Sequence, residues 1–148
     1  MKVHIEQGTP DKASHIASLI MEAMNTDCCQ NFAGPHHTLV DFHQMMERLV
    51  KMEDSQYSYL NTLVASNSEG IITGILVAYD GAKLKELRRQ FIKEAIVSFG
   101  IDYSAMDAET EAGEFYLDSL AVSSSFRGKG IAKQLLAAAI EKARELGI

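Results

Sequence analysis

The spacing of apolar residues divides the chain into short strand-like segments and longer helix-like segments. Alternation of apolar and polar residues predicts a first strand over Val3–Gln7. Runs rich in apolar and β-branched residues predict further strands over Tyr57–Ser66, Ile71–Tyr79 and Tyr116–Val122. The second and third strands are separated only by the turn-forming residues Asn67–Gly70, so we expect them to form an antiparallel hairpin.

Four helices are predicted by apolar residues that recur every three or four positions. The first begins at Thr9-Pro10-Asp11, which is typical of a helix N-terminus, and runs to Met24. The second follows Thr38, which with Asp41 resembles a capping box, and residues 25–37 before it are predicted to be a loop. The third spans Lys83–Phe99, and the fourth runs from Ile131 to Leu146.

A glycine-rich turn joins the last predicted strand to the last predicted helix. Its residues, Arg127-Gly-Lys-Gly130-Ile-Ala132, place two glycines and two cations directly before the helix. Backbone N–H groups at a helix N-terminus, together with the helix dipole, favour phosphate binding. The turn lacks the Gly-Lys-Ser/Thr ending of a P-loop, and Lys133 stands where a dinucleotide fingerprint needs its third glycine.

The turn fits fully the pattern Arg/Gln-x-x-Gly-x-Gly/Ala, and Leu120-Ala121-Val122 stands five residues before Arg127. In both respects the segment resembles the coenzyme-A signature of the GNAT superfamily of N-acetyltransferases. The order of the predicted elements is also similar to the first part of a GNAT domain. The resemblance implies an α/β protein of the α+β type, with a mixed, largely antiparallel central sheet flanked by helices.

Two features depart from that family. The helix over Lys83–Phe99 is extra, between the third and fourth strands, and we interpret it as packing over the sheet or as a homodimer contact. The chain also ends where the family continues with a fifth strand, one more helix (the fourth of the family fold) and a closing hairpin. We therefore interpret residues 1–148 as a single, C-terminally truncated GNAT-like domain, in which one wall of the coenzyme-A cleft is absent. The alternatives are a wall supplied by another chain and a protein that is not a working enzyme.

The resemblance implies that acetyl-CoA is the co-substrate and that the turn binds its pyrophosphate. It also implies that the last residues of the fourth strand hold the pantetheine through their backbone and orient the thioester carbonyl. The predicted cofactor-binding residues are Leu120, Ala121, Val122, Arg127, Gly128, Lys129, Gly130, Ile131, Ala132 and Lys133.

The candidate catalytic residue is Asp118. An amine with a lysine-like pKa is charged at neutral pH, so a base must remove a proton before it attacks. Some family members use a glutamate six residues before the valine of the strand ending, but that position is Tyr116 here. Asp118 lies on the same strand face as Tyr116 if the side chains alternate regularly. We therefore predict Asp118 as the base and name no general acid.

Composition narrows the choice of partners. The net charge of −6 disfavours nucleic-acid binding, and no apolar run is long enough for a membrane span. We expect a cytoplasmic enzyme that needs no metal and acts on a small-molecule or peptide amine. The adjacent Cys28 and Cys29 match no disulfide framework or metal motif, even with His36 and His37.

The acidic residues between Asp102 and Glu114 carry a further hypothesis. They are Asp102, Asp107, Glu109, Glu111 and Glu114. Placed near the acceptor entrance, they would attract a cationic amine, although a solvated loop is the alternative interpretation.

Two other functions stay open. One is a non-catalytic acyl-CoA-binding or sensory module of the same fold, and the other is a nucleotide-binding domain unrelated to coenzyme A. The identity of the amine is not encoded in any of these patterns.

Overall fold

A four-stranded antiparallel sheet forms the centre of the protein in the computed structural model, which describes residues 2–106 and 113–148. The strand order is β1-β2-β3-β4, so strands that are consecutive in sequence are neighbours in the sheet. The strands are β1 (His4–Gln7), β2 (Thr62–Ser66), β3 (Ile72–Asp80) and β4 (Phe115–Val122). All three pairings are antiparallel, and the predicted β2–β3 hairpin is confirmed.

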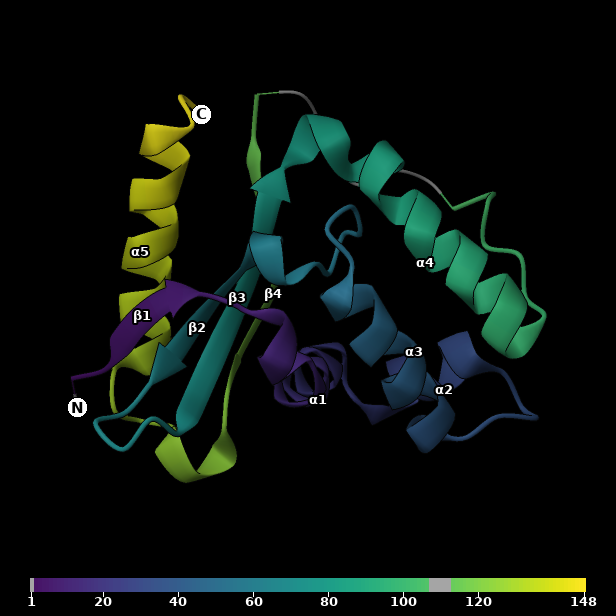
Figure 1. Ribbon diagram of the computed structural model, residues 1–148, viewed down its shortest axis with the longest axis horizontal. Helices are drawn as coiled ribbons and strands as arrows, with labels where there is room; N and C mark the ends of the chain where they lie inside the picture. The colour runs from purple at the N-terminus through teal and green to yellow at the C-terminus, as the bar shows by residue number, and fades with distance from the viewer. Residues whose placement is uncertain (1, 107–112) are drawn as a thin grey trace.

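Helices cover both faces of this sheet (Figure 1). They are α1 (Ala13–Met24), α2 (Thr26–Ala33), α3 (Leu39–Lys51), α4 (Leu84–Phe99) and α5 (Ile131–Glu145). One core cluster joins α1, α2, α3 and α4 to one face, and a second, smaller cluster joins α5 to the other. The short 3-10 helices are Pro10–Lys12, Tyr59–Asn61, Gly81–Lys83 and Ser124–Phe126.

The capping box predicted at the start of α3 is confirmed. The Thr38 side chain accepts a hydrogen bond from the Asp41 backbone N–H at 3.2 Å, and the Asp41 carboxylate accepts one from the Thr38 N–H at 2.9 Å. These bonds satisfy backbone donors that lack intrahelical partners. The backbone N–H bond from Thr38 holds the pKa of Asp41 below its ordinary value, so the cap stays charged.

The prediction of a loop over residues 25–37 is wrong in part, because α2 occupies Thr26–Ala33. Asn25 adopts a positive φ of 74° and caps this helix by accepting a hydrogen bond from the Cys28 N–H at 2.9 Å. Only Cys29 and Ala33 of α2 are buried, so its sequence carries almost no apolar stripe from which a helix could be predicted.

The predicted strand over Tyr57–Ser66 begins five residues too early, since β2 starts at Thr62. Side-chain bonds to the backbone shape the preceding segment instead. Ser58 Oγ accepts from the Leu60 N–H at 3.1 Å, and Thr62 Oγ1 donates to the Ser58 carbonyl at 3.0 Å. Such local bonds compete with a strand ladder. At the predicted helix start, the Thr9 side chain makes no capping hydrogen bond, and the 3-10 turn Pro10–Lys12 precedes α1.

The inserted helix is confirmed as α4, and it packs against α3 rather than directly over the sheet. Phe91 and Phe99 are buried within the chain, so these two residues belong to the core and not to a dimer surface. The side chain of Arg48 on α3 lies 3.3 Å from the Glu94 carboxylate on α4. This contact holds α4 beside the helices that cover the sheet.

Gly74 of β3 brings β4 and α5 close together. A Cβ at this position would lie 2.9 Å from the Ala121 carbonyl oxygen and 3.3 Å from a methyl carbon of Leu135. Only glycine leaves room for this approach. The position of β4 relative to α5, and so the geometry of the turn between them, depends on this missing side chain.

Candidate functional site

A β-bulge in β4 positions the candidate catalytic residue. Ser119 pairs with Val77 and Leu117 pairs with Ala78, so Asp118 is an additional residue without a direct partner on β3. A bulge redirects side chains and changes their alternation. Up to the bulge, the side chains of Tyr116 and Asp118 face α1–α3. After it, the side chain of Ala121 faces the same helices, although regular alternation from Asp118 would put it on the opposite face of the sheet.

Three donors hold the carboxylate of Asp118. The Tyr79 hydroxyl donates to Oδ2 at 2.5 Å, and the Gln56 side-chain amide donates to the same oxygen at 2.9 Å. The Ser119 hydroxyl lies 3.2 Å from Oδ1. A carboxylate has about four acceptor positions, so acceptor capacity remains on Oδ1. Gln56 and Tyr79 are far from Asp118 in sequence, so no pattern along the chain identifies them as its partners.

Asp118 lines a cavity of about 290 Å³ between the sheet and the helices. Met24, Phe32 and Phe91 contribute apolar surface to it, from α1, α2 and α4. Tyr116 also lines this cavity, as the predicted shared face with Asp118 requires. The cavity therefore combines an apolar wall with an oriented carboxylate, which is the usual composition of a small-molecule site.

Two tyrosines next to Asp118 remain protonated at neutral pH. Burial raises the pKa of Tyr57 and of Tyr79 well above the ordinary tyrosine value, and the negative charge of Asp118 raises both further. A neutral phenol keeps its O–H donor. The Tyr79 hydroxyl therefore acts as a permanent hydrogen-bond donor to Asp118 and not as a source of negative charge.

The turn between β4 and α5 forms a second cavity, of about 350 Å³. Gly128 and Gly130 adopt positive φ angles of 78° and 79°, in the left-handed region that favours glycine. Gly130 is the N-cap of α5, and no side chain caps the helix there. The first N–H groups of a helix have no intrahelical acceptor, so they are available to an anion at this end.

Most of the predicted cofactor-binding residues meet at this cavity. Those that line it are Leu120, Val122, Arg127, Gly128, Gly130, Ile131 and Ala132. Ala121 packs into the core on the other face of the sheet, and the side chains of Lys129 and Lys133 are exposed outside the lining. Within the described residues β4 pairs only with β3, so its other edge faces this region.

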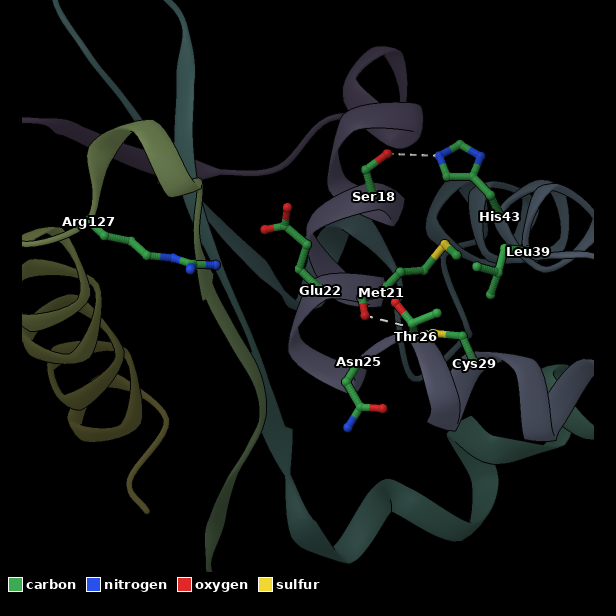
Figure 2. A pocket seen from close by; sticks show the side chains of 9 residues that line it. All are labelled: Ser18, Met21, Glu22, Asn25, Thr26, Cys29, Leu39, His43 and Arg127. Carbon is green, nitrogen blue, oxygen red and sulfur yellow. Dashed lines mark hydrogen bonds between the residues drawn. The ribbon is translucent and has the colours of Figure 1, made fainter.

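Arg127 also borders a third cavity, of about 450 Å³, on the helical side of the turn (Figure 2). Its Nε donates to the Val122 carbonyl at 3.1 Å, which fixes the guanidinium beside the end of β4. Figure 2 shows the arginine side chain extending from the turn towards Glu22 of α1. Arg127 is thus the residue of the turn that borders both cavities.

Ser18 and His43 in this third cavity are not a nucleophile and its base. The two side chains lie 3.1 Å apart, as Figure 2 shows. The same His43 nitrogen, Nε2, lies 3.0 Å from the Ser14 carbonyl, which can only accept a hydrogen bond. Assigning the ring proton to Nε2 satisfies this carbonyl, and with that tautomer Nε2 cannot take a proton from Ser18. The pair connects α3 to α1.

Cys29 is also unsuited to carrying an acyl group. Its side chain is fully buried, and burial raises the pKa of its thiol to about 11. The reactive thiolate is therefore scarce at neutral pH. Among residues 2–106 and 113–148, no group of three or more His, Cys, Asp or Glu side chains is arranged to hold a metal ion. In the same residues, no helix has the length and hydrophobicity needed to cross a bilayer.

The acidic segment proposed to attract the acceptor falls largely outside the described residues. Asp107, Glu109 and Glu111 belong to that undescribed part. Asp102 and Glu114 at its borders are exposed, and the Asp102 carboxylate accepts a hydrogen bond from the Ser104 N–H at 2.9 Å.

Comparison with known proteins finds a family match and similar folds. A sequence model described as the acetyltransferase (GNAT) family matches residues 44–148. An acetyltransferase structure has a TM-score of 0.78 and 24% identity, over 97% of this chain and 76% of that one. An N-acetyltransferase from Staphylococcus aureus Mu50 has a TM-score of 0.76 and 20% identity, over 94% and 75%.

One less similar structure was solved with a bound ligand. A GNAT family acetyltransferase from Brucella melitensis, solved in complex with acetyl-CoA, has a TM-score of 0.52 and 15% identity, over 99% of this chain and 71% of that one. A search of curated proteins found no match.

Proposed function

Since the chain belongs to the GNAT acetyltransferase family, we propose that it transfers the acetyl group of acetyl-CoA to a primary amine within a ternary complex. The observation that carries this proposal is the joint between β4 and α5. There, an uncapped helix N-terminus, two glycines with positive φ and an outer strand edge all border one cavity. The similar fold of the Brucella melitensis enzyme, which binds acetyl-CoA, supports the same cofactor here.

In this proposal the pyrophosphate of acetyl-CoA binds at the turn. The N–H groups of residues 128–133 donate to its oxygens, and the dipole of α5 adds a favourable field. Arg127 supplies positive charge beside the turn, where its Nε is already held by the Val122 carbonyl. Lys129 and Lys133 add positive charge at the same turn, and solvent screens the charges of all three cations because all three are exposed.

The pantetheine then extends along the outer edge of β4, next to Leu120, Ala121 and Val122. Backbone groups on that edge hold the arm and place the thioester near the bulge. An N–H group directed at the thioester carbonyl stabilises the oxyanion that forms during transfer, since preorganised donors lower the barrier of such steps. This role requires backbone atoms only, which is consistent with the packing of the Ala121 side chain in the core.

Asp118 is the proposed base. The acceptor amine enters the cavity of about 290 Å³ and loses one proton to Asp118, directly or through a water molecule. Its nitrogen then attacks the thioester carbonyl carbon, the carbon–sulfur bond breaks, and the departing thiolate takes up a proton. Tyr79 and Gln56 position the carboxylate by donating to Oδ2.

A non-catalytic acyl-CoA-binding module is the second candidate. The observation that favours it is the environment of Asp118, whose carboxylate interacts with three donors of the protein itself. A carboxylate held in this way also serves to join β4 to the loop that precedes β2. In the module, acetyl-CoA would bind but its acetyl group would not be transferred to any amine.

The test combines binding and turnover. Acetyl-CoA is titrated into the protein by calorimetry, and release of the coenzyme A thiol is followed while amines are supplied. We expect saturable acetyl-CoA binding and amine-dependent thiol release. Binding without release for any amine would favour the module, and absence of acetyl-CoA binding would refute both candidates.

A further inference from the structure

Arg88 brings a positive charge to the cavity that contains Asp118. It lies on α4, the helix inserted between β3 and β4, and is only 8% exposed. Arg88 borders the cavity of about 290 Å³ and also an adjoining cavity of about 440 Å³, and Met106 borders both as well. Lys85 and Arg89, from the same helix, line the adjoining cavity.

The charges of Arg88 and Asp118 act on the same small space. Both influence the Tyr57 hydroxyl, whose pKa is raised mainly by burial and then by Asp118, while Arg88 lowers it. The two sides of the cavity are also joined through the backbone, since the Gln56 N–H donates to the Leu87 carbonyl at 3.2 Å. Gln56 holds Asp118, and Leu87 is adjacent to Arg88. This backbone bond therefore joins the segment that holds Asp118 to the helix that carries Arg88.

A buried guanidinium is costly unless acceptors surround it. Its five N–H donors form a planar fork that fits the two oxygens of a carboxylate or phosphate. Five donors are enough to bond a protein acceptor and an incoming anion together. Apolar residues such as Phe91, Met24 and Phe32 make up much of the remaining wall, so an anion bound here would be partly shielded from solvent.

We propose that Arg88 binds an anionic group of the acceptor, which is therefore a small amine that also carries a carboxylate or a phosphate. The amine lies towards Asp118 and the anionic group towards Arg88. Lys85 and Arg89 attract the same group at the adjoining cavity. This inference rests on the proposed acetyl transfer and adds to it the chemical class of the acceptor.

The experiment uses pairs of acceptors that differ only in the anionic group. Suitable pairs are lysine with cadaverine, arginine with agmatine, tyrosine with tyramine, and phosphoethanolamine with ethanolamine. For each pair kcat/KM is measured with saturating acetyl-CoA. We expect the anionic member to be preferred by about 10-fold to 100-fold, the range for one charge-assisted contact. A preference confined to the amino acids or to phosphoethanolamine identifies which anion is bound.

Variants then assign the preference to Arg88. In Arg88→Met, which retains much of the side-chain volume, we expect the preference to disappear mainly through a higher KM for the anionic member. In Arg88→Lys, which keeps the charge without the fork, we expect an intermediate value. Lys93→Met is the matched control, because Lys93 is an exposed cation on the same helix and borders none of the cavities described above. Circular dichroism verifies that each variant folds.

Three results would overturn the inference. One is equal use of both members of every pair by the wild-type protein, and another is a preference for the anionic member that persists in Arg88→Met. The third is turnover of the amine-only members alone, which would refute the anionic subsite while leaving acetyl transfer intact. Failure of acetyl-CoA itself to bind would instead refute the proposed function, so the two failures are distinguishable.

Discussion

Ala132 offers a test in which stability and cofactor binding should change in opposite directions. It lies in the first turn of α5 and lines the cavity at the turn. A glutamate at this position puts a negative charge at the positive end of the helix dipole. Because the native first turn contains no acidic residue, we expect Ala132→Glu to leave the fold intact or to stabilise it slightly.

The two effects differ clearly in size. A carboxylate in the first turn of a helix stabilises it by about 0.3–1 kcal/mol. The same carboxylate about 5 Å from a phosphate charge is repelled by roughly 3 kcal/mol at an effective dielectric constant of about 20. Since each 1.4 kcal/mol is a factor of ten, acetyl-CoA should bind about a hundredfold more weakly.

Calorimetric titration with acetyl-CoA measures the loss, and thermal unfolding measures the stability. Ala137→Glu is the matched control, since Ala137 is exposed in the middle of the same helix and away from the turn. An acetyl-CoA affinity in Ala132→Glu within about threefold of that in Ala137→Glu would refute the placement of the pyrophosphate at the α5 N-terminus.

Three further predictions follow from the site and its scaffold. Asp118→Asn should lower kcat by about 10²–10⁴-fold near neutral pH, while the affinity for acetyl-CoA is retained. An unchanged kcat in steady-state kinetics would eliminate Asp118 as the base. Gly74→Ala should destabilise the protein by about 1–3 kcal/mol in urea unfolding, because the new Cβ would lie 2.9 Å from the Ala121 carbonyl oxygen. A Gly74→Ala variant as stable as the wild type would contradict that contact. Thr38→Ala should cost about 1 kcal/mol in thermal unfolding at neutral pH. The folded-state pKa of Asp41 is lowered, mainly by the Thr38 backbone N–H, so the Asp41 part of the cap is present above the unfolded pKa of about 4 and is lost as the pH falls through the folded value. A destabilisation by Asp41→Ala that grows in acid would contradict this sign.

Much of the fold follows from patterns that are local in the chain. The hairpin, the capping box at Thr38 and the α4 helix were predictable because each depends on residues close together in sequence. The α2 helix was not, because its boundary is set by the positive φ of Asn25 and its burial is limited to two small residues. The helical spacing of apolar residues from Ile131 to Leu146 predicts one buried face for α5, but Ile140 and Leu146 of that spacing are each 57% exposed.

The candidate site was predictable only where it is continuous in the chain. The turn from Arg127 to Ala132 and the strand before it are such a segment, and most of its predicted residues border one cavity. The contacts of Asp118 depend on Gln56 and Tyr79, which the fold brings from 62 and 39 residues away. No periodic pattern reports such contacts. The burial of Arg88 was predictable from the sequence, because Arg88 stands four residues after Leu84 and therefore on the buried face of α4.

The bulged strand β4 also fixes the distance between Asp118 and the turn that follows the strand. The segment from Asp118 to Val122 spans about 13 Å of extended chain, with the candidate base at one end and the proposed phosphate-binding turn beyond the other. A donor that engages the turn and reacts beside Asp118 must bridge that length. A short donor such as acetyl phosphate reaches one end only, whereas a donor with a long arm reaches both. Under the proposed function, the length of this strand segment would select acyl donors by their length, before any side chain distinguishes their chemistry.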